Sequence, residues 1–207
     1  MASDHMAWIL KSTFGRAAAL LLGLGATACA GGTGHLLNEY LDEHTGAHLA
    51  VVGRPLTFAL ERSTLAANAR DYVSLAAAEV DRSGHAQTYL IGYFWSTIDR
   101  RKKAAGSAPA DLTVALFADG RWLRLAPEST IPADLSASPK LLAPPAAAAV
   151  EAVYRVTEEQ LRYLADSRSI ILHLAAAAED DPDAEPYQLW TDGRRELSAF
   201  NRSIASP

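Results

Sequence analysis

The sequence predicts an α+β domain, built mainly of antiparallel β-strands in a sandwich-like or layered sheet, with one or two helices near the C-terminus. Three observations predict it. Short apolar runs rich in β-branched and aromatic residues alternate with turn-forming clusters through the first two thirds of the chain. An Asp-Gly pair, the strongest short-range hairpin signal, separates two of these runs. Helical spacing of apolar residues is clear only after Thr157.

The first strands are expected on both sides of a Gly53-Arg54-Pro55 turn, at residues 48–52 and 56–60. Residues 72–80 and 88–98 form the strongest pair, and the turn-forming cluster between them suits a hairpin. Because residues 88–98 carry aromatic and apolar side chains on both faces, we expect a central strand buried on both sides.

The middle of the chain predicts a second hairpin. Residues 112–117 and 122–125 are apolar runs that flank Asp119-Gly120. Residues 127–149 then hold five prolines among alanines and serines, which predicts a long irregular connection that is either functional or mobile.

The last third changes character. Thr157-Glu158-Glu159-Gln160 is a capping box, because the threonine and glutamine can each satisfy a free backbone donor, and it predicts a helix to about Ser167. A final helix, capped by Asp192, would carry Leu197, Phe200 and Ile204 on one face. Strands are expected around this first helix and before the last one, at residues 150–156, 170–174 and 187–190.

Composition limits the function. The 207 residues suit one domain with appendages, and the formal charge of −5 gives no basic footprint for a nucleic-acid partner. One cysteine allows no internal disulfide framework. Neither a Gly-x-Ser-x-Gly elbow nor a Gly-x-Gly-x-x-Gly motif occurs, so the sequence favours a non-catalytic protein without a cofactor.

The N-terminal segment has the order of a secretory signal. Lys11 and Arg16 precede the apolar run 17–25, and Ala26-Thr27-Ala28-Cys29 follows it. The run is shorter than the roughly 20 residues that a bilayer-spanning helix needs. Residues 1–6 are read as a remnant of an expression vector or as residues before a true start at Met6.

The segment ending at Cys29 resembles the lipobox of bacterial lipoproteins, with Ala26 in place of the usual leucine. The resemblance implies a signal peptide over residues 1–28 and lipidation of Cys29. Because Ala30 is not aspartate, the resemblance also implies sorting to the outer membrane. We expect the domain on the periplasmic side. Residues 29–46 would be a lipid-anchored tether and lead-in, and residues 47–207 a single β-rich domain.

Two alternatives remain for Cys29. Ala26-Thr27-Ala28 also fits ordinary signal peptidase, which would leave a protein secreted to the periplasm with a free N-terminal thiol. The other alternative is a buried apolar helix that holds the cysteine in a core, although the glycines and alanines around it pack poorly.

Few residues suggest chemistry. His44 and His48 have a spacing that could hold zinc on a helix, but Gly46 between them favours an exposed polar loop. Residues 179–183 could hold calcium, but they lack the glycine and distal glutamate of the known loop pattern. Arg100 and Arg101 could bind an acidic partner or lipid headgroups, although solubilising loop charge is the simpler reading.

The tryptophans at positions 95, 122 and 190 all fall in expected strands, where they could line a ligand groove. The sequence favours core packing for Trp95, Trp122 and Trp190, and also for His173.

Three functions remain open. The first is a non-catalytic envelope lipoprotein that binds a protein or another envelope component. The second is a membrane-anchored hydrolase, for which His44, His48 and His85 would be the first residues to consider. The third is a carrier of small apolar ligands, which a large pocket lined by Trp95 or Trp122 would favour.

Overall fold

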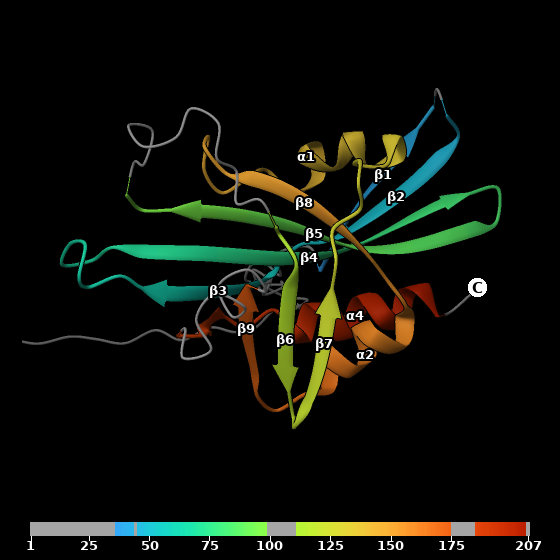
Figure 1. The fold of residues 1–207 in the computed structure, drawn as a ribbon. Coiled ribbons are helices and arrows are strands. Elements are labelled where there is room, and N and C mark those ends of the chain that lie inside the picture. The colour runs from blue at the N-terminus through green and yellow to red at the C-terminus, as the bar shows by residue number, and fades with distance from the viewer. Residues whose placement is uncertain (1–35, 44, 99–110, 175–184, 206–207) are drawn as a thin grey trace, which may run out of the picture. The chain divides into compact units, whose positions relative to one another are not determined.

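The computed structural model describes residues 36–43, 45–98, 111–174 and 185–205. These residues form a mainly antiparallel β-sheet with helices late in the chain, which confirms the predicted fold class (Figure 1). The strands are β1 (Leu37–Asp42), β2 (Ala47–Val52), β3 (Leu56–Glu61), β4 (Arg70–Arg82), β5 (His85–Ser96), β6 (Val114–Ala118), β7 (Arg121–Leu125), β8 (Val150–Val156), β9 (Ile170–Leu174) and β10 (Tyr187–Thr191). The helices are the 3₁₀-helix η1 (Ala133–Ala137), α1 (Ser138–Leu141), α2 (Glu158–Asp166) and α4 (Arg194–Ile204).

The sheet splits into two branches at one edge of its long strand β4. On one side of β4 lie β5 and then β8. On the other side β2 and β3 pair with different ends of β4. Past β2 the sheet ends with β1, whereas past β3 it continues through β10, β9, β6 and β7. In Figure 1 the strands β6, β7 and β9 run across the direction of β3, β4 and β5.

The division of the sheet corrects the predicted turn at Gly53-Arg54-Pro55. Val51 pairs with Ala78 and Leu56 pairs with Leu75, both antiparallel to β4. The chain therefore bends between β2 and β3 but does not reverse. Because the chain bends here, β3 is a separate strand from β2, and β10 pairs with β3 but not with β2.

The two predicted hairpins are confirmed. Ser83 and Gly84 have φ of 55° and 82°, and Asp119 and Gly120 have φ of 42° and 85°. Positive φ at both central residues is the requirement of a type I′ turn, which matches the twist of the flanking strands. The predicted central strand is also confirmed, because β5 lies between β4 and β8 and its residues 89–94 are buried.

One face of the sheet builds the core with α2 and α4. Alternate residues of β3 and β4, such as Phe58, Val73 and Leu75, are buried on this face with Leu197 and Phe200 of α4. The predicted capping box is present, with the Gln160 amide nitrogen 3.2 Å from the Thr157 hydroxyl oxygen. None of the helices in the described part of the chain is long and apolar enough to cross a membrane.

The opposite face is partly covered by η1 and α1, which Figure 1 shows on the other side of the sheet from α2 and α4. Both helices lie in the stretch predicted as irregular, where Leu135 and Ser138 are fully buried. The Asn38 side chain donates a hydrogen bond to the Leu141 carbonyl at 2.9 Å, which fixes α1 on β1. The sheet thus begins with β1, inside the segment predicted as a lead-in.

The start of the last helix also differs from prediction. Its N-cap position is Gly193, and no side chain caps it. The Asp192 carboxylate instead accepts a hydrogen bond from the Arg194 backbone nitrogen at 3.0 Å and binds the Arg194 guanidinium.

Candidate binding groove

A groove lies on the sheet face opposite α2 and α4. Its volume is about 460 Å³, and its lining comes from three sheet strands, the end of β10, and the segment after α1. Side chains alternate between faces along a strand, so the buried Val73 and Leu75 place Tyr72 and Ser74 in the groove. The lining residues are Pro55, Thr57, Tyr72, Ser74, Tyr93, Trp95, Leu142, Ala143, Pro145, Trp190 and Thr191.

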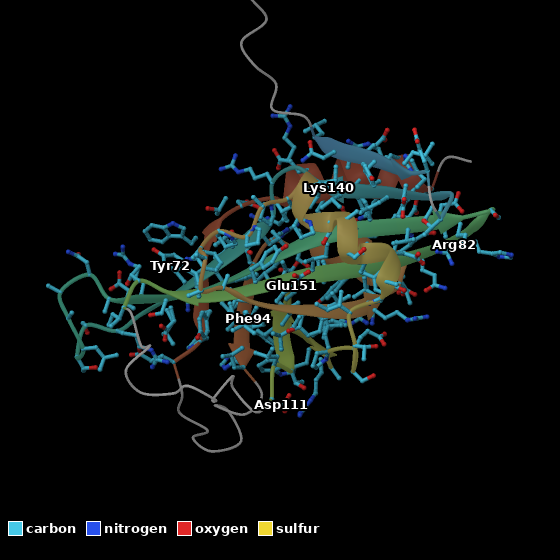
Figure 2. The ribbon with its side chains drawn as sticks, turned by 90° about the horizontal axis from the view of Figure 1, so that it is seen from above. Tyr72, Arg82, Phe94, Asp111, Lys140 and Glu151 are labelled. Carbon is cyan, nitrogen blue, oxygen red and sulfur yellow. The ribbon has the colours of Figure 1, made fainter. Side chains whose placement is uncertain are left out.

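Three aromatic rings form the open end of this groove. Tyr72 and Trp95 are directly opposed on β4 and β5, and their rings stack with centroids 5.0 Å apart and planes 12° apart. Trp190 meets Tyr72 edge-on, with centroids 6.3 Å apart and planes at 75°, and 56% of Trp190 is exposed. Figure 2 shows Tyr72 toward the end of the long strands opposite to Arg82.

The guanidinium group of Arg70 places a positive charge beside these rings. Its guanidinium carbon lies 4.8 Å from the centroid of the Trp190 ring, within the range of a cation–π contact. Its Nε and Nη2 atoms donate hydrogen bonds to Glu61 at 3.3 and 2.9 Å. The pKa of Arg70 is raised, first by the hydrogen bond to Glu61 and then by one to Tyr72. We call Arg70, Tyr72, Trp95 and Trp190 the aromatic cluster.

The remainder of the groove is neutral and rich in hydroxyl groups. The side chains of Thr57, Ser74 and Thr191 form no hydrogen bond with any other residue that the structure describes. At the closed end the Tyr93 hydroxyl donates a long hydrogen bond, 3.5 Å, to the Leu142 carbonyl. Burial, and secondarily the nearby Glu151 carboxylate, raises the pKa of Tyr93 to about 12, so its hydroxyl is neutral at physiological pH.

A second hollow of about 510 Å³ lies on the other side of Trp190. Arg70, Glu61 and Glu185 contribute charge to it, and Leu60 and Leu189 contribute apolar surface. Trp190 therefore separates a neutral groove from a charged one.

Trp122 belongs to a separate aromatic group at the far side of the same sheet face. Its ring lies 4.9 Å from Phe117 and 5.3 Å from His173, centroid to centroid, and 59% of it is exposed. The register links it to the aromatic cluster through one row of directly opposed residues: Trp95, Tyr72, Ala59, Gln188, Ile171, Phe117 and Trp122.

Core packing was the wrong prediction for Trp122 and Trp190, which are mostly exposed, while Trp95 is half-buried. The physical reason is that each of their strands has one face in the core and one face outside. His173 is likewise half-buried against Trp122 and not enclosed in the core.

The other predicted site residues are not brought to the groove. Cys29, His44, Arg100, Arg101 and residues 179–183 lie outside the described residues. His48 lies on β2, 3.9 Å from the Glu39 carboxylate. His85 is exposed at the start of β5. Within the described ranges, no three His, Cys, Asp or Glu side chains gather as metal ligands would.

Sequence reasoning missed Arg70 and Tyr72. A partial signal was available, because Tyr72 and Ser74 alternate with the more apolar Val73 and Leu75, although the charged Asp71 breaks the pattern next to Arg70. That alternation marks an outward face of β4, but only the pairing with β5 and β10 shows that tryptophans lie beside it.

The groove is therefore the candidate functional site of the described residues. Comparison with known protein families, with curated proteins and with solved structures finds no match to this chain.

Proposed function

We propose that this chain is a lipid-anchored protein of the bacterial envelope whose domain binds another protein through the groove. The observation that carries the binding role is the aromatic cluster. Trp, Tyr and Arg are the residues most enriched among those that dominate binding energy in protein interfaces. Here Tyr72, Trp95 and Trp190 line one groove, and Arg70 contacts the Trp190 ring from the neighbouring hollow.

The geometry of the cluster favours tight binding. Arg70 is held by Glu61, and Tyr72 is stacked on Trp95, so these side chains are already ordered before a partner arrives. Ordering a mobile side chain on binding costs about 0.5–1.5 kcal/mol, and this arrangement avoids much of that cost. The exposed ring of Trp190 supplies apolar area that a partner can remove from water.

The N-terminal sequence supports the proposed location in the bacterial envelope. Ala26-Thr27-Ala28-Cys29 follows a short apolar run in the order of a lipoprotein signal. Several acyl chains on one cysteine exceed the marginal membrane affinity of a single chain. The short segment Ala30-Gly31-Gly32-Thr33-Gly34 would give the domain a flexible tether.

A small-ligand carrier is the second candidate, because Trp95 lines a groove whose volume falls in the usual range for ligand sites, roughly 300–1,000 Å³. The protein-binding function fits better. The groove lies on an outer face of the sheet and is bordered by the exposed Trp190, whereas a carrier encloses its ligand.

Site-specific photo-crosslinking in the native cells tests the binding function. A photoreactive residue at Ala143, in the groove wall, is expected to give a discrete protein adduct that disappears in the Trp190→Ala variant. The same residue at Glu159, exposed on α2, is the matched control and should give no such adduct. Equal adducts at both positions, or none at Ala143, would contradict the proposal.

A further inference from the structure

We infer that the groove binds a proline-rich segment of the partner in the polyproline II conformation. This inference rests on the proposed function and specifies the chemistry of the partner.

The shape of the groove supports an extended, ring-bearing ligand. The stacked Tyr72–Trp95 pair forms one ridge, and Trp190 stands at 75° to Tyr72 as a second. Pro55 and Leu142 add apolar surface to the lining. Proline-rich segments in the polyproline II conformation are known to dock in grooves lined by aromatic rings.

Hydrogen-bonding groups in the groove favour the same ligand. Among the described residues, no acceptor pairs with the hydroxyls of Thr57, Ser74 and Thr191 or with the indole N–H groups of Trp95 and Trp190. The hydroxyls can donate or accept, the indole N–H groups can only donate, and the lining contains no carboxylate or carboxamide side chain. A proline-rich backbone offers carbonyl acceptors and few N–H donors, so its needs can be met by this lining.

The same inventory disfavours an oligosaccharide, although sugars also stack on aromatic rings. Sugar hydroxyls donate as well as accept, and the only side-chain acceptors in this lining are hydroxyl oxygens, without a carboxylate or carboxamide. A polyproline II segment is in addition already extended in solution, so that it loses little conformational entropy on binding.

Isothermal titration calorimetry of the full-length protein in detergent, with acetylated decaproline as the probe, tests the inference. Decaproline is expected to bind, and a decamer of alternating Gly and Ser is not. Trp190→Ala should weaken decaproline binding about tenfold or more, as at an interface hot spot. Ser74→Ala, which removes one donor, should weaken it about threefold to tenfold.

Trp122→Ala is the matched control, because Trp122 is equally exposed but lies outside the groove. Its decaproline affinity should equal that of the unmodified protein, and circular dichroism should confirm that every variant is folded. Affinity that is insensitive to Trp190→Ala would overturn the inference, since binding would then lie elsewhere.

Two further outcomes separate this inference from the proposed function. If decaproline does not bind while the Ala143 adduct persists in cells, the polyproline ligand is wrong and protein binding stands. If a chitotetraose probe binds in place of decaproline, and the adduct is also absent, both proposals are overturned.

Discussion

At the scale of single residues, Gly193 determines how the last helix meets the bend in the sheet. An added Cβ at this position would lie 2.7 Å from the carbonyl carbon and oxygen of Pro55, and it would also collide with the Arg54 carbonyl oxygen. All of these are backbone atoms, so no side-chain rotation can relieve the contact. The close approach explains why a residue without a side chain precedes α4.

Gly193→Ala is therefore expected to destabilise the domain. The helix start or the β2–β3 bend must move, and overpacking of this kind typically costs about 1–3 kcal/mol. Urea unfolding followed by circular dichroism measures it as a lower midpoint. Arg195→Ala, an exposed position in the same helix, is the control and should change the free energy of unfolding by less than about 0.5 kcal/mol. Equal stability of the two variants would refute the steric argument.

Asn201 is a second residue with a clear energetic consequence. It is only 8% exposed, and neither its Oδ1 nor its Nδ2 atom has a hydrogen-bond partner among the described residues. A buried polar group without a partner costs about 1–3 kcal/mol on mutational scales.

Asn201→Leu, which keeps the approximate size, is expected to raise the free energy of unfolding by about 1–2 kcal/mol. Thermal unfolding at neutral pH checks this as a higher Tm. Arg195→Leu adds the same side chain at an exposed position of α4 and controls for helix propensity. A lower Tm for Asn201→Leu would show that the amide has a stabilising role.

At the scale of elements, Asp119 joins the tip of the β6–β7 hairpin to the connection between α2 and β9. Its carboxylate accepts hydrogen bonds from the backbone nitrogens of Arg168 and Ser169, at 3.0–3.1 Å. These hydrogen bonds lower the pKa of Asp119, and the bond from the Arg168 backbone has the largest effect. Arg194 completes the junction, because its guanidinium donates to the carbonyls of Ser167 and Arg168 at the end of α2.

The lowered pKa gives Asp119 a defined pH dependence. A carboxyl whose folded-state pKa lies below its unfolded value, about 3.9, stabilises the fold fully above that value and loses this effect as the pH falls through the folded pKa. Asp119→Asn keeps a residue that tolerates the positive φ but removes the charge. The variant is therefore expected to be less stable at pH 7.

Urea titrations from pH 7 to pH 3 measure the difference in the free energy of unfolding between the Asp119→Asn variant and the unmodified protein. The difference should be largest at neutral pH and shrink below about pH 4, where the native carboxyl becomes protonated. A difference that does not change with pH would mean that the charge contributes nothing to this junction.

The elements also show how much of the fold the sequence predicts. Local signals were sufficient for both type I′ hairpins and for the capping box at Thr157, because each depends on residues adjacent in the chain. The path after Gly53-Arg54-Pro55 was not predictable in the same way. Whether the chain reverses or only bends there depends on β4, which pairs with both β2 and β3.

The groove was predictable only in part, for a related reason. Sequence reasoning singled out Trp95 and Trp190 and considered a ligand groove, but it favoured the core. Strand alternation gives two faces and does not say which one a distant segment will cover. Leu142 to Pro145 cover only part of the outer face, beside Tyr93, and leave the aromatic cluster open.

At the scale of the whole molecule, the two faces of the sheet are covered differently. One face packs on α2 and α4, while the other is partly covered by η1 and α1 and presents the groove, whose residue Tyr93 also belongs to the core. Trp190 belongs to β10, a short strand that joins β3 to β9 through a few paired residues and a register shift.

The proposal places this domain at a membrane surface, and that claim depends on Cys29. Full-length protein made in a Gram-negative host with a palmitate analogue tests it most directly, alongside Cys29→Ala. Our account predicts label on the unmodified protein in the outer-membrane fraction and none on the variant. An unlabelled protein with a mature N-terminus at Cys29 would make it a secreted protein with a free thiol. A chain that is neither labelled nor cleaved would contradict the proposed location in the bacterial envelope.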